Sequence, residues 1–155
     1  MTPPLTLAIG QFQPRKADYP ASLERLGALF ARLDALDPRP QVLHLPETAL
    51  TGYFLEGGVR ESAMTAGVLV RDLDETYRAA VQSPRPLDVV VGFYEIWRNR
   101  LFNSAMYVTL GAGEPVVRHI HRKVFLPTYG MFDEERFVEQ GQDVRAYETP
   151  WGRAA

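Results

Sequence analysis

An apolar run in the middle of the chain constrains the fold more than any other feature. Residues 88–95 read Asp-Val-Val-Val-Gly-Phe-Tyr-Glu and are rich in β-branched and aromatic side chains. A run without polar alternation is typical of a strand that is covered on both faces, as in sheets that contain parallel strands. The sequence therefore predicts a strand at 88–95 that is buried between two layers.

The segments before this run alternate between strand and helix patterns. Apolar segments at 5–12 and 41–45 predict two short strands. Leucine and phenylalanine recur at helical spacing over 22–36, and a second helical pattern covers roughly 68–81. A proline-containing stretch follows each helical segment and predicts its end. The order is thus strand, helix, strand, helix and then the central strand.

The segments after the central run predict a series of further strands. Residues 101–110 and 115–123 read as strands, with a turn at 97–100 and a hairpin loop at 111–114. This order indicates an α/β fold with parallel pairing early in the chain and antiparallel pairing later. The 155 residues show no internal repeat or linker, so we expect one domain.

The composition excludes several classes of function. The net charge is −2, with no basic stripe, which argues against a nucleic-acid partner. No apolar run is long enough to span a membrane, and the N-terminus lacks the pattern of a secretory signal. We therefore expect a cytoplasmic protein. The chain has no cysteine, which excludes disulfides and thiolate metal sites within it.

Two charged residues follow predicted strands and are candidates for a site. Glu47 comes directly after the strand at 41–45, and Lys123 ends the strand at 115–123. Sites in α/β sheets gather at the C-terminal ends of strands. Only Lys16 and Lys123 are lysines among 17 basic residues, and a lysine in such an arginine-rich composition favours a role for a compact ammonium at Lys123. On spacing alone, ordinary surface residues remain the favoured interpretation.

Two other pairs of polar residues give weaker indications of a functional site. His119 and His121 lie on one face of a predicted strand at a spacing that can bind zinc, but no third ligand has suitable spacing. We therefore expect no metal site. Asn103 and Ser104 are interpreted as a structural pair, because no Gly-x-Ser-x-Gly motif surrounds the serine.

Two motifs together identify a family resemblance. Segment 46–53 reads Pro-Glu-x-x-Leu-x-Gly-Tyr, and segment 122–136 reads Arg-Lys-x-x-Leu-Pro-x-Tyr-Gly-x-Phe-Asp-Glu-x-Arg. This pair resembles the nitrilase, or carbon–nitrogen hydrolase, superfamily. The second motif is most similar to the glutaminase (amidase) domains of glutamine-dependent NAD synthetases and their free-standing relatives. Supporting matches at 10–12 and 101–105 extend the resemblance from Leu5 to the last residue.

The resemblance implies an architecture. It predicts the αββα sandwich of the nitrilase superfamily, with residues 1–155 as the N-terminal part of a single carbon–nitrogen hydrolase domain that is truncated at the C-terminus. It also implies a homodimer or larger homo-oligomer. The chemistry of the family implies no metal and no organic cofactor.

The resemblance also implies roles for individual residues. Glu47 would be the general base, and Lys123 would stabilise the oxyanion. Glu134 would be a second glutamate that positions the substrate and the lysine. The resemblance assigns three aromatic residues to the substrate pocket: Tyr53, Tyr129 and Phe132.

The family nucleophile, a cysteine, is expected a few residues beyond the segment 151–155. We therefore expect an enzyme that hydrolyses a small, non-peptide amide through a thioester, and we expect the 155-residue chain alone to be inactive. One alternative is a nitrilase or N-carbamoyl amino acid hydrolase of the same superfamily. The other is a non-catalytic, truncated homologue that acts as a binding or structural partner.

Overall fold

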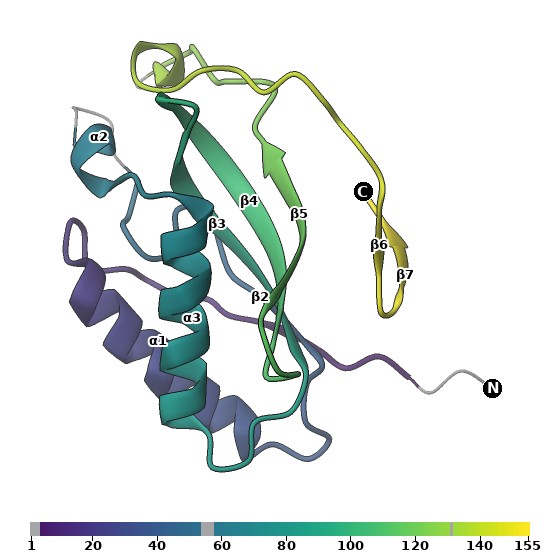
Figure 1. The fold of residues 1–155 in the computed structure, drawn as a ribbon. Helices are drawn as coiled ribbons and strands as arrows, with labels where there is room; N and C mark the ends of the chain where they lie inside the picture. The colour runs from purple at the N-terminus through teal and green to yellow at the C-terminus, as the bar shows by residue number, and fades with distance from the viewer. Residues whose placement is uncertain (1–3, 54–57, 131) are drawn as a thin grey trace.

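The computed structural model describes residues 4–53, 58–130 and 132–155 (Figure 1). Their main feature is one five-stranded sheet with the strand order β1-β2-β3-β4-β5. Its strands are β1 (Leu7–Ile9), β2 (Val42–His44), β3 (Leu87–Trp97), β4 (Arg100–Leu110) and β5 (Val116–Arg122). The remaining elements are α1 (Tyr19–Asp34), α2 (Val59–Ser62), α3 (Ala66–Ala80), the 3₁₀ helix η1 (Glu134–Arg136) and a hairpin of β6 (Tyr147–Thr149) and β7 (Gly152–Ala154).

The pairing of the sheet changes direction at its centre. β1 pairs with β2, and β2 with β3, in parallel, whereas β3 with β4 and β4 with β5 are antiparallel. This confirms the order of parallel and antiparallel pairing that the sequence predicts. The apolar run lies in β3, the middle strand, where Val89 and Val91 are fully buried.

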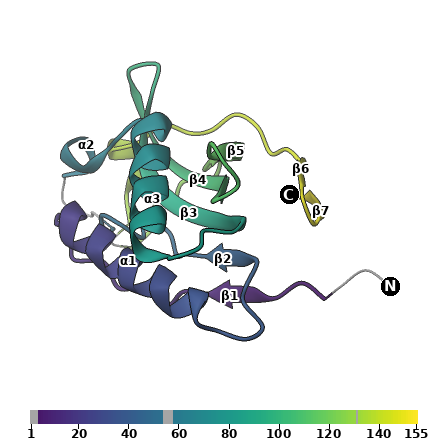
Figure 2. The same ribbon diagram turned by 60° about the horizontal axis from the view of Figure 1, so that its bottom comes forward.

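Helices α1 and α3 cover one face of the sheet (Figures 1 and 2). Phe30 of α1 and Tyr77 of α3 pack edge to face with their ring centroids 5.1 Å apart. Both helices direct their apolar stripes into one core with the side chains of the sheet. The fully buried members of this core include Leu26, Phe30, Leu43, Leu69, Leu73, Val89, Val91, Met106, Val108 and Leu110.

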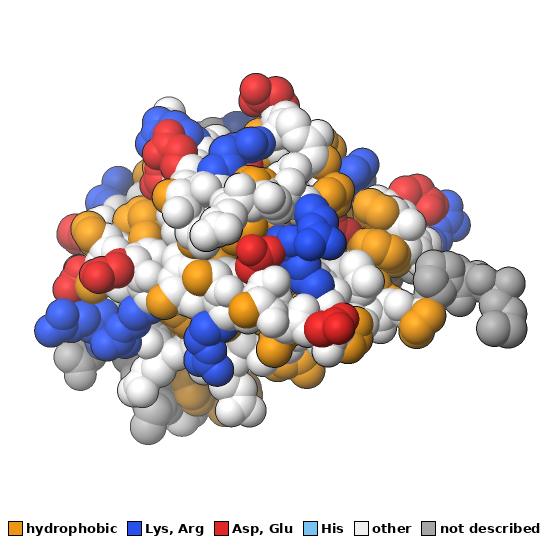
Figure 3. Space-filling view, turned by 90° about the horizontal axis from the view of Figure 1, so that it is seen from below, with side chains coloured by type: hydrophobic (Ala, Val, Ile, Leu, Met, Phe, Trp, Pro, Cys, Tyr) orange, Lys and Arg blue, Asp and Glu red, His pale blue; other side chains and the backbone are white. Residues whose placement is uncertain are grey.

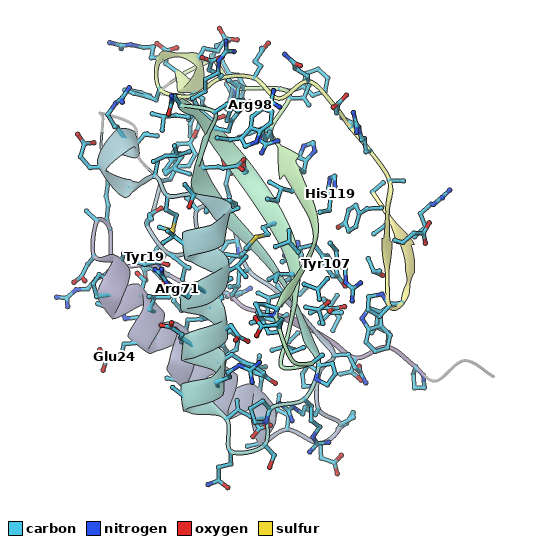
Figure 4. The ribbon with its side chains drawn as sticks, viewed as in Figure 1. Tyr19, Glu24, Arg71, Arg98, Tyr107 and His119 are labelled. Atoms are coloured by element: carbon cyan, nitrogen blue, oxygen red, sulfur yellow. The ribbon has the colours of Figure 1, made fainter. Side chains whose placement is uncertain are left out.

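The β6–β7 hairpin lies on the opposite side of the sheet from the helices (Figure 2). Asp88 of β3 is buried and accepts hydrogen bonds from the Tyr107 hydroxyl and the Trp151 indole, each at 2.7 Å. The rings of His119 and Tyr147 stack with centroids 4.4 Å apart. In Figure 4, Tyr107 and His119 lie on this side, whereas Tyr19 and Arg71 belong to the helical layer. The two faces of the sheet thus have different coverings.

The described residues form one helical layer and one sheet of the expected αββα sandwich, together with the hairpin on the second face. Figure 3 shows acidic, basic and hydrophobic side chains interspersed on the face seen from below. None of the described helices combines the length and the apolar character that crossing a bilayer requires.

The helix boundaries differ from the prediction for local reasons. α1 begins at Tyr19 because the Asp18 side chain accepts a hydrogen bond from the Ala21 amide at 3.1 Å and caps the helix. It ends at Asp34, so Leu36 lies beyond it and is 52% exposed. α3 begins at Ala66 because Thr65 caps it through the Val68 amide.

Several strand and turn predictions also needed correction. The first strand is limited to Leu7–Ile9, and the short helix α2 and the β6–β7 hairpin were not predicted. Trp97 and Arg100 belong to strands rather than to the turn between them. That turn consists of Arg98 and Asn99, whose φ angles of 50° and 61° match the twist of a tight hairpin.

The core supports a test of the fold. Leu73→Ala removes a fully buried side chain between α3 and the sheet and leaves a cavity, so we expect a loss of about 2–5 kcal/mol in the free energy of unfolding. Urea denaturation measures it. Leu36→Ala is the matched control, because Leu36 is exposed and its truncation should change stability by less than about 0.5 kcal/mol. Equal effects of the two substitutions would contradict this packing.

Candidate active site

Glu47 lies on a turn that crosses the sheet directly over β3. The Leu45 amide donates to the Val90 carbonyl at 2.8 Å, and the Ala49 amide donates to the Gly92 carbonyl at 3.2 Å. A Cβ atom at Gly92 would lie 2.8 Å from the Glu47 Cα. The missing side chain of Gly92 therefore lets the turn approach the sheet, which is why a glycine interrupts the apolar run.

Lys123 is held at the end of β5 by main-chain bonds on two sides. Its amide donates to the Asn103 carbonyl at 2.8 Å, and its carbonyl accepts from the Gly141 amide at 2.9 Å. The Lys123 Nζ lies 2.9 Å from the Glu47 Oε1 and 3.0 Å from the Glu134 Oε2. One ammonium thus bridges two carboxylates that are 87 positions apart in the sequence.

Glu134 is the more enclosed of the two carboxylates. It begins η1, and its side chain is 6% exposed, whereas that of Glu47 is 49% exposed. Glu134 accepts a hydrogen bond from the Tyr53 hydroxyl. The structure therefore brings together the three residues that the resemblance singles out for chemistry.

Asn103 joins the same cluster from β4. Its Nδ2 donates to the Glu47 Oε1 at 2.5 Å and to the Glu134 Oε1 at 3.0 Å. The interpretation of Asn103 as a purely structural residue did not include these contacts. Asn103 pairs with Tyr94 and so faces away from the helical core, and this pairing is visible only in the structure. A polar residue on that face of a central strand is a candidate for the site.

The electrostatics favour a charged lysine and a neutral tyrosine. Burial lowers the pKa of Lys123, but the hydrogen bonds and negative charges of Glu47 and Glu134 outweigh it, so the net pKa is raised. The pKa of Tyr53 is also raised, first by burial and then by its hydrogen bond to Glu134 and the charge of that carboxylate. Tyr53 therefore acts as a hydrogen-bond donor at neutral pH.

The three predicted pocket residues form an aromatic group beside the carboxylates. Phe132 contacts Tyr53 and Tyr129 with ring centroids at 6.0 and 6.1 Å, both in edge-to-face arrangements. Tyr53 links this group to the charged cluster through Glu134. Tyr129 is 72% exposed, so the described residues alone do not enclose a substrate on that side.

The candidate zinc pair lies in β5, and His121 is two positions before Lys123. His119 and His121 stack with ring centroids 6.5 Å apart, and His119 also stacks on Tyr147. Burial, followed by the charges of His121 and Arg145, lowers the pKa of His119. Among the described residues, no group of three or more His, Cys, Asp or Glu side chains is arranged to hold a metal ion.

Comparisons with known sequences place this geometry in context. No family model matches the chain. A glutamine-dependent NAD(+) synthetase from Thermotoga maritima is 28% identical over 142 residues, which are 90% of this chain and 23% of that protein. The chain therefore spans about a quarter of the length of this curated relative.

Comparisons with solved structures show the fold. A glutamine-dependent NAD+ synthetase from Acinetobacter baumannii superposes with a TM-score of 0.68 at 20% identity, covering 95% of this chain and 26% of that chain. A CN-hydrolase superfamily protein from Xanthomonas campestris superposes with a TM-score of 0.74 at 17% identity, covering 96% of this chain and 51% of that chain. These findings confirm the resemblance and the fold class stated from the sequence.

The close approach at Gly92 predicts opposite effects at two glycines. Gly92→Ala forces a methyl group against the main chain of Glu47 and Thr48, so we expect a loss of about 1–3 kcal/mol in the free energy of unfolding. Gly67→Ala, in helix α3, meets no atom within 4 Å and should raise stability by about 0.5–1 kcal/mol. Urea denaturation of both variants measures this contrast, and a neutral Gly92→Ala would refute the close approach.

The raised pKa of Lys123 predicts how stability depends on pH. A raised folded-state pKa means that the ion-pair contribution is complete below the ordinary lysine value of 10.5 and is lost as the pH rises through the folded-state value. The difference in unfolding free energy between the wild type and Lys123→Met should therefore narrow in this alkaline range. Denaturation at a series of pH values measures it, and a constant difference would show that the ion pairs do not contribute.

Proposed function

We propose that residues 1–155 are the N-terminal part of a single carbon–nitrogen hydrolase domain that cleaves a non-peptide amide. The observation that carries this proposal is the ammonium of Lys123, which lies within 3.0 Å of one oxygen of Glu47 and one of Glu134. A thioester mechanism requires a base and an oxyanion stabiliser beside its thiol, and the half-exposed Glu47 and the fixed ammonium of Lys123 are groups of these two kinds.

The proposed reaction assigns a step to each group. Glu47 takes the proton of the attacking thiol, because its side chain is half exposed while one oxygen is fixed on Lys123. The attack places negative charge on the carbonyl oxygen, which Lys123 stabilises; one such donor contributes about 3–4 kcal/mol. Ammonia or an amine leaves with the proton, and Glu47 then activates water to hydrolyse the thioester. Glu134 holds the lysine and the substrate in place.

The nucleophile of this mechanism must come from outside these residues. None of the 155 residues is a cysteine. The chain also corresponds to only 23% of the Thermotoga maritima relative. We therefore propose that the 155-residue chain by itself does not turn over substrate.

The proposed substrate class is a linear amide that resembles the side chain of glutamine. Support comes from the similarity of the chain to two glutamine-dependent NAD(+) synthetases, which are 28% and 23% identical to it. Nitriles and N-carbamoyl amino acids are the competing classes, because a thiolate attacks all three at an electrophilic carbon bonded to nitrogen.

A second candidate function is binding without catalysis. The absence of cysteine from the whole chain favours it. In this case the chain would act as a binding or structural partner, and the charged cluster would recognise an amide without cleaving it. Hydrolysis by any longer, cysteine-containing form of the protein excludes this candidate.

The assignment predicts the loss of turnover in two variants. In a cysteine-containing form of the protein, Glu47→Gln removes the base and Lys123→Ala removes the oxyanion donor, so each should lower kcat by at least about 10²-fold. Release of ammonia from glutamine, a nitrile and an N-carbamoyl amino acid, assayed side by side, measures this and identifies the substrate class.

Glu135→Gln is the matched control for these variants. Glu135 is exposed and adjacent to Glu134 but contacts Gln140 rather than the cluster, so its replacement should leave kcat unchanged. The unextended 155-residue chain is the negative control and should give the background rate. Wild-type turnover by Glu47→Gln or Lys123→Ala would end the assignment.

A further inference from the structure

We infer that Asn103 is a positioning residue that ties one oxygen of Glu47 and leaves the other, Oε2, free to accept the proton. The inference rests on the proposed amide hydrolysis for its chemical meaning. The arrangement it describes is a property of the chain itself and is tested separately from catalysis.

The contacts of Glu47 divide its two oxygens into different roles. Its Oε1 accepts from the Asn103 Nδ2 at 2.5 Å and from the Lys123 Nζ at 2.9 Å. Its Oε2 has no hydrogen bond to any of the residues that the structure describes, and the side chain is 49% exposed. A carboxylate held by one oxygen presents the second as an acceptor in a defined direction, as a general base must.

The contacts of Glu134 show the opposite pattern. Its Oε1 accepts from both the Tyr53 hydroxyl and Asn103, and its Oε2 faces the Lys123 ammonium. Both oxygens of this enclosed carboxylate are therefore engaged, and neither is available to take a proton from a nucleophile. The difference between the two glutamates follows from how donors are distributed around them.

Asn103 suits this position because it is neutral and has two hydrogens on one nitrogen. Each hydrogen is directed to a different carboxylate, which fixes the spacing between two like charges without adding a third charge. An aspartate here would supply no donor and would add repulsion, and a leucine of similar size would leave both acceptors without this partner.

Removing the Asn103 side chain should displace the carboxylate of Glu47 but not the side chains of Glu134 and Lys123. Glu134 would keep Tyr53 and Lys123 as partners. The main chain of Lys123 is fixed by the hydrogen bond from its amide to the Asn103 carbonyl, and this bond does not depend on the side chain of Asn103. The half-exposed Glu47 would keep only its contact with the Lys123 Nζ, at the end of a long side chain. We therefore expect its carboxylate to rotate away from the cluster.

Ser104 provides a matched control on the same strand. It is as buried as Asn103 but faces the other side of the sheet, where its hydroxyl donates to the buried Glu95 at 2.8 Å. Ser104→Ala therefore perturbs the same stretch of β4 without touching the charged cluster. A general effect of weakening this strand would appear in both variants.

The first test uses the side-chain ammonium signals of the 155-residue chain in NMR. Lys16 and Lys123 are the only lysines, so two signals cover the whole chain. In Asn103→Leu the Lys123 pKa should fall, because Glu47 no longer stays beside the ammonium, and Ser104→Ala should leave it unchanged. Asn103→Ser, a smaller polar replacement, should lower it as well and serves if the leucine variant does not fold. An unchanged or higher Lys123 pKa in a folded Asn103 variant overturns the inference.

The second test separates positioning from folding in a cysteine-containing form of the protein. Asn103→Leu should lower kcat by about 10-fold or more while KM changes by less than about 2-fold, because the base is misdirected and the aromatic pocket is intact. Wild-type kcat in Asn103→Leu, with Glu47→Gln inactive, overturns the inference but keeps the proposed function. Full activity of Glu47→Gln overturns the proposed function, and the NMR result on the chain then still decides whether Asn103 holds Glu47.

Discussion

The attraction between one ammonium and two carboxylates is the interaction on which the site depends. Glu47 and Glu134 approach the same lysine, and two like charges at such short separation repel strongly unless a cation lies between them. Lys123 supplies that charge, and the neutral donors Asn103 and Tyr53 complete the coordination. The fold therefore has to deliver two carboxylates, a cation and two neutral donors to one point, from four separate parts of the chain.

The sheet achieves this by giving its two faces different tasks. In β4, Met106 and Val108 point into the helical core, whereas Asn103 and Tyr107 point to the other face, where they bind carboxylates. The apolar face supplies the burial that stabilises the domain, and the second face carries its polar contacts. Gly92 belongs to this second face, and its missing side chain makes room for the turn that carries Glu47.

Much of this architecture could be predicted from sequence because its signals are local. The apolar run of β3, the periodic helices and the ends of β2 and β5 are each encoded within about ten residues. The contacts of Asn103 and Tyr53 could not be predicted in this way, because they join residues from 31 to 81 positions apart. The β6–β7 hairpin was missed for a similar reason. Its Trp151 is held by Asp88, which lies 63 positions earlier, so its local sequence carried little information.

The position of β5 has a consequence for how long the site stays assembled. Within the described sheet β5 is a border strand that pairs with β4 alone, and its first three residues are exposed. A border strand unfolds locally at a smaller free-energy cost than a central strand, and such local unfolding occurs repeatedly under native conditions. When β5 detaches, Lys123 leaves with it while Glu47 remains on the central strands. The charged cluster can therefore dissociate by local unfolding of β5, without global unfolding of the protein.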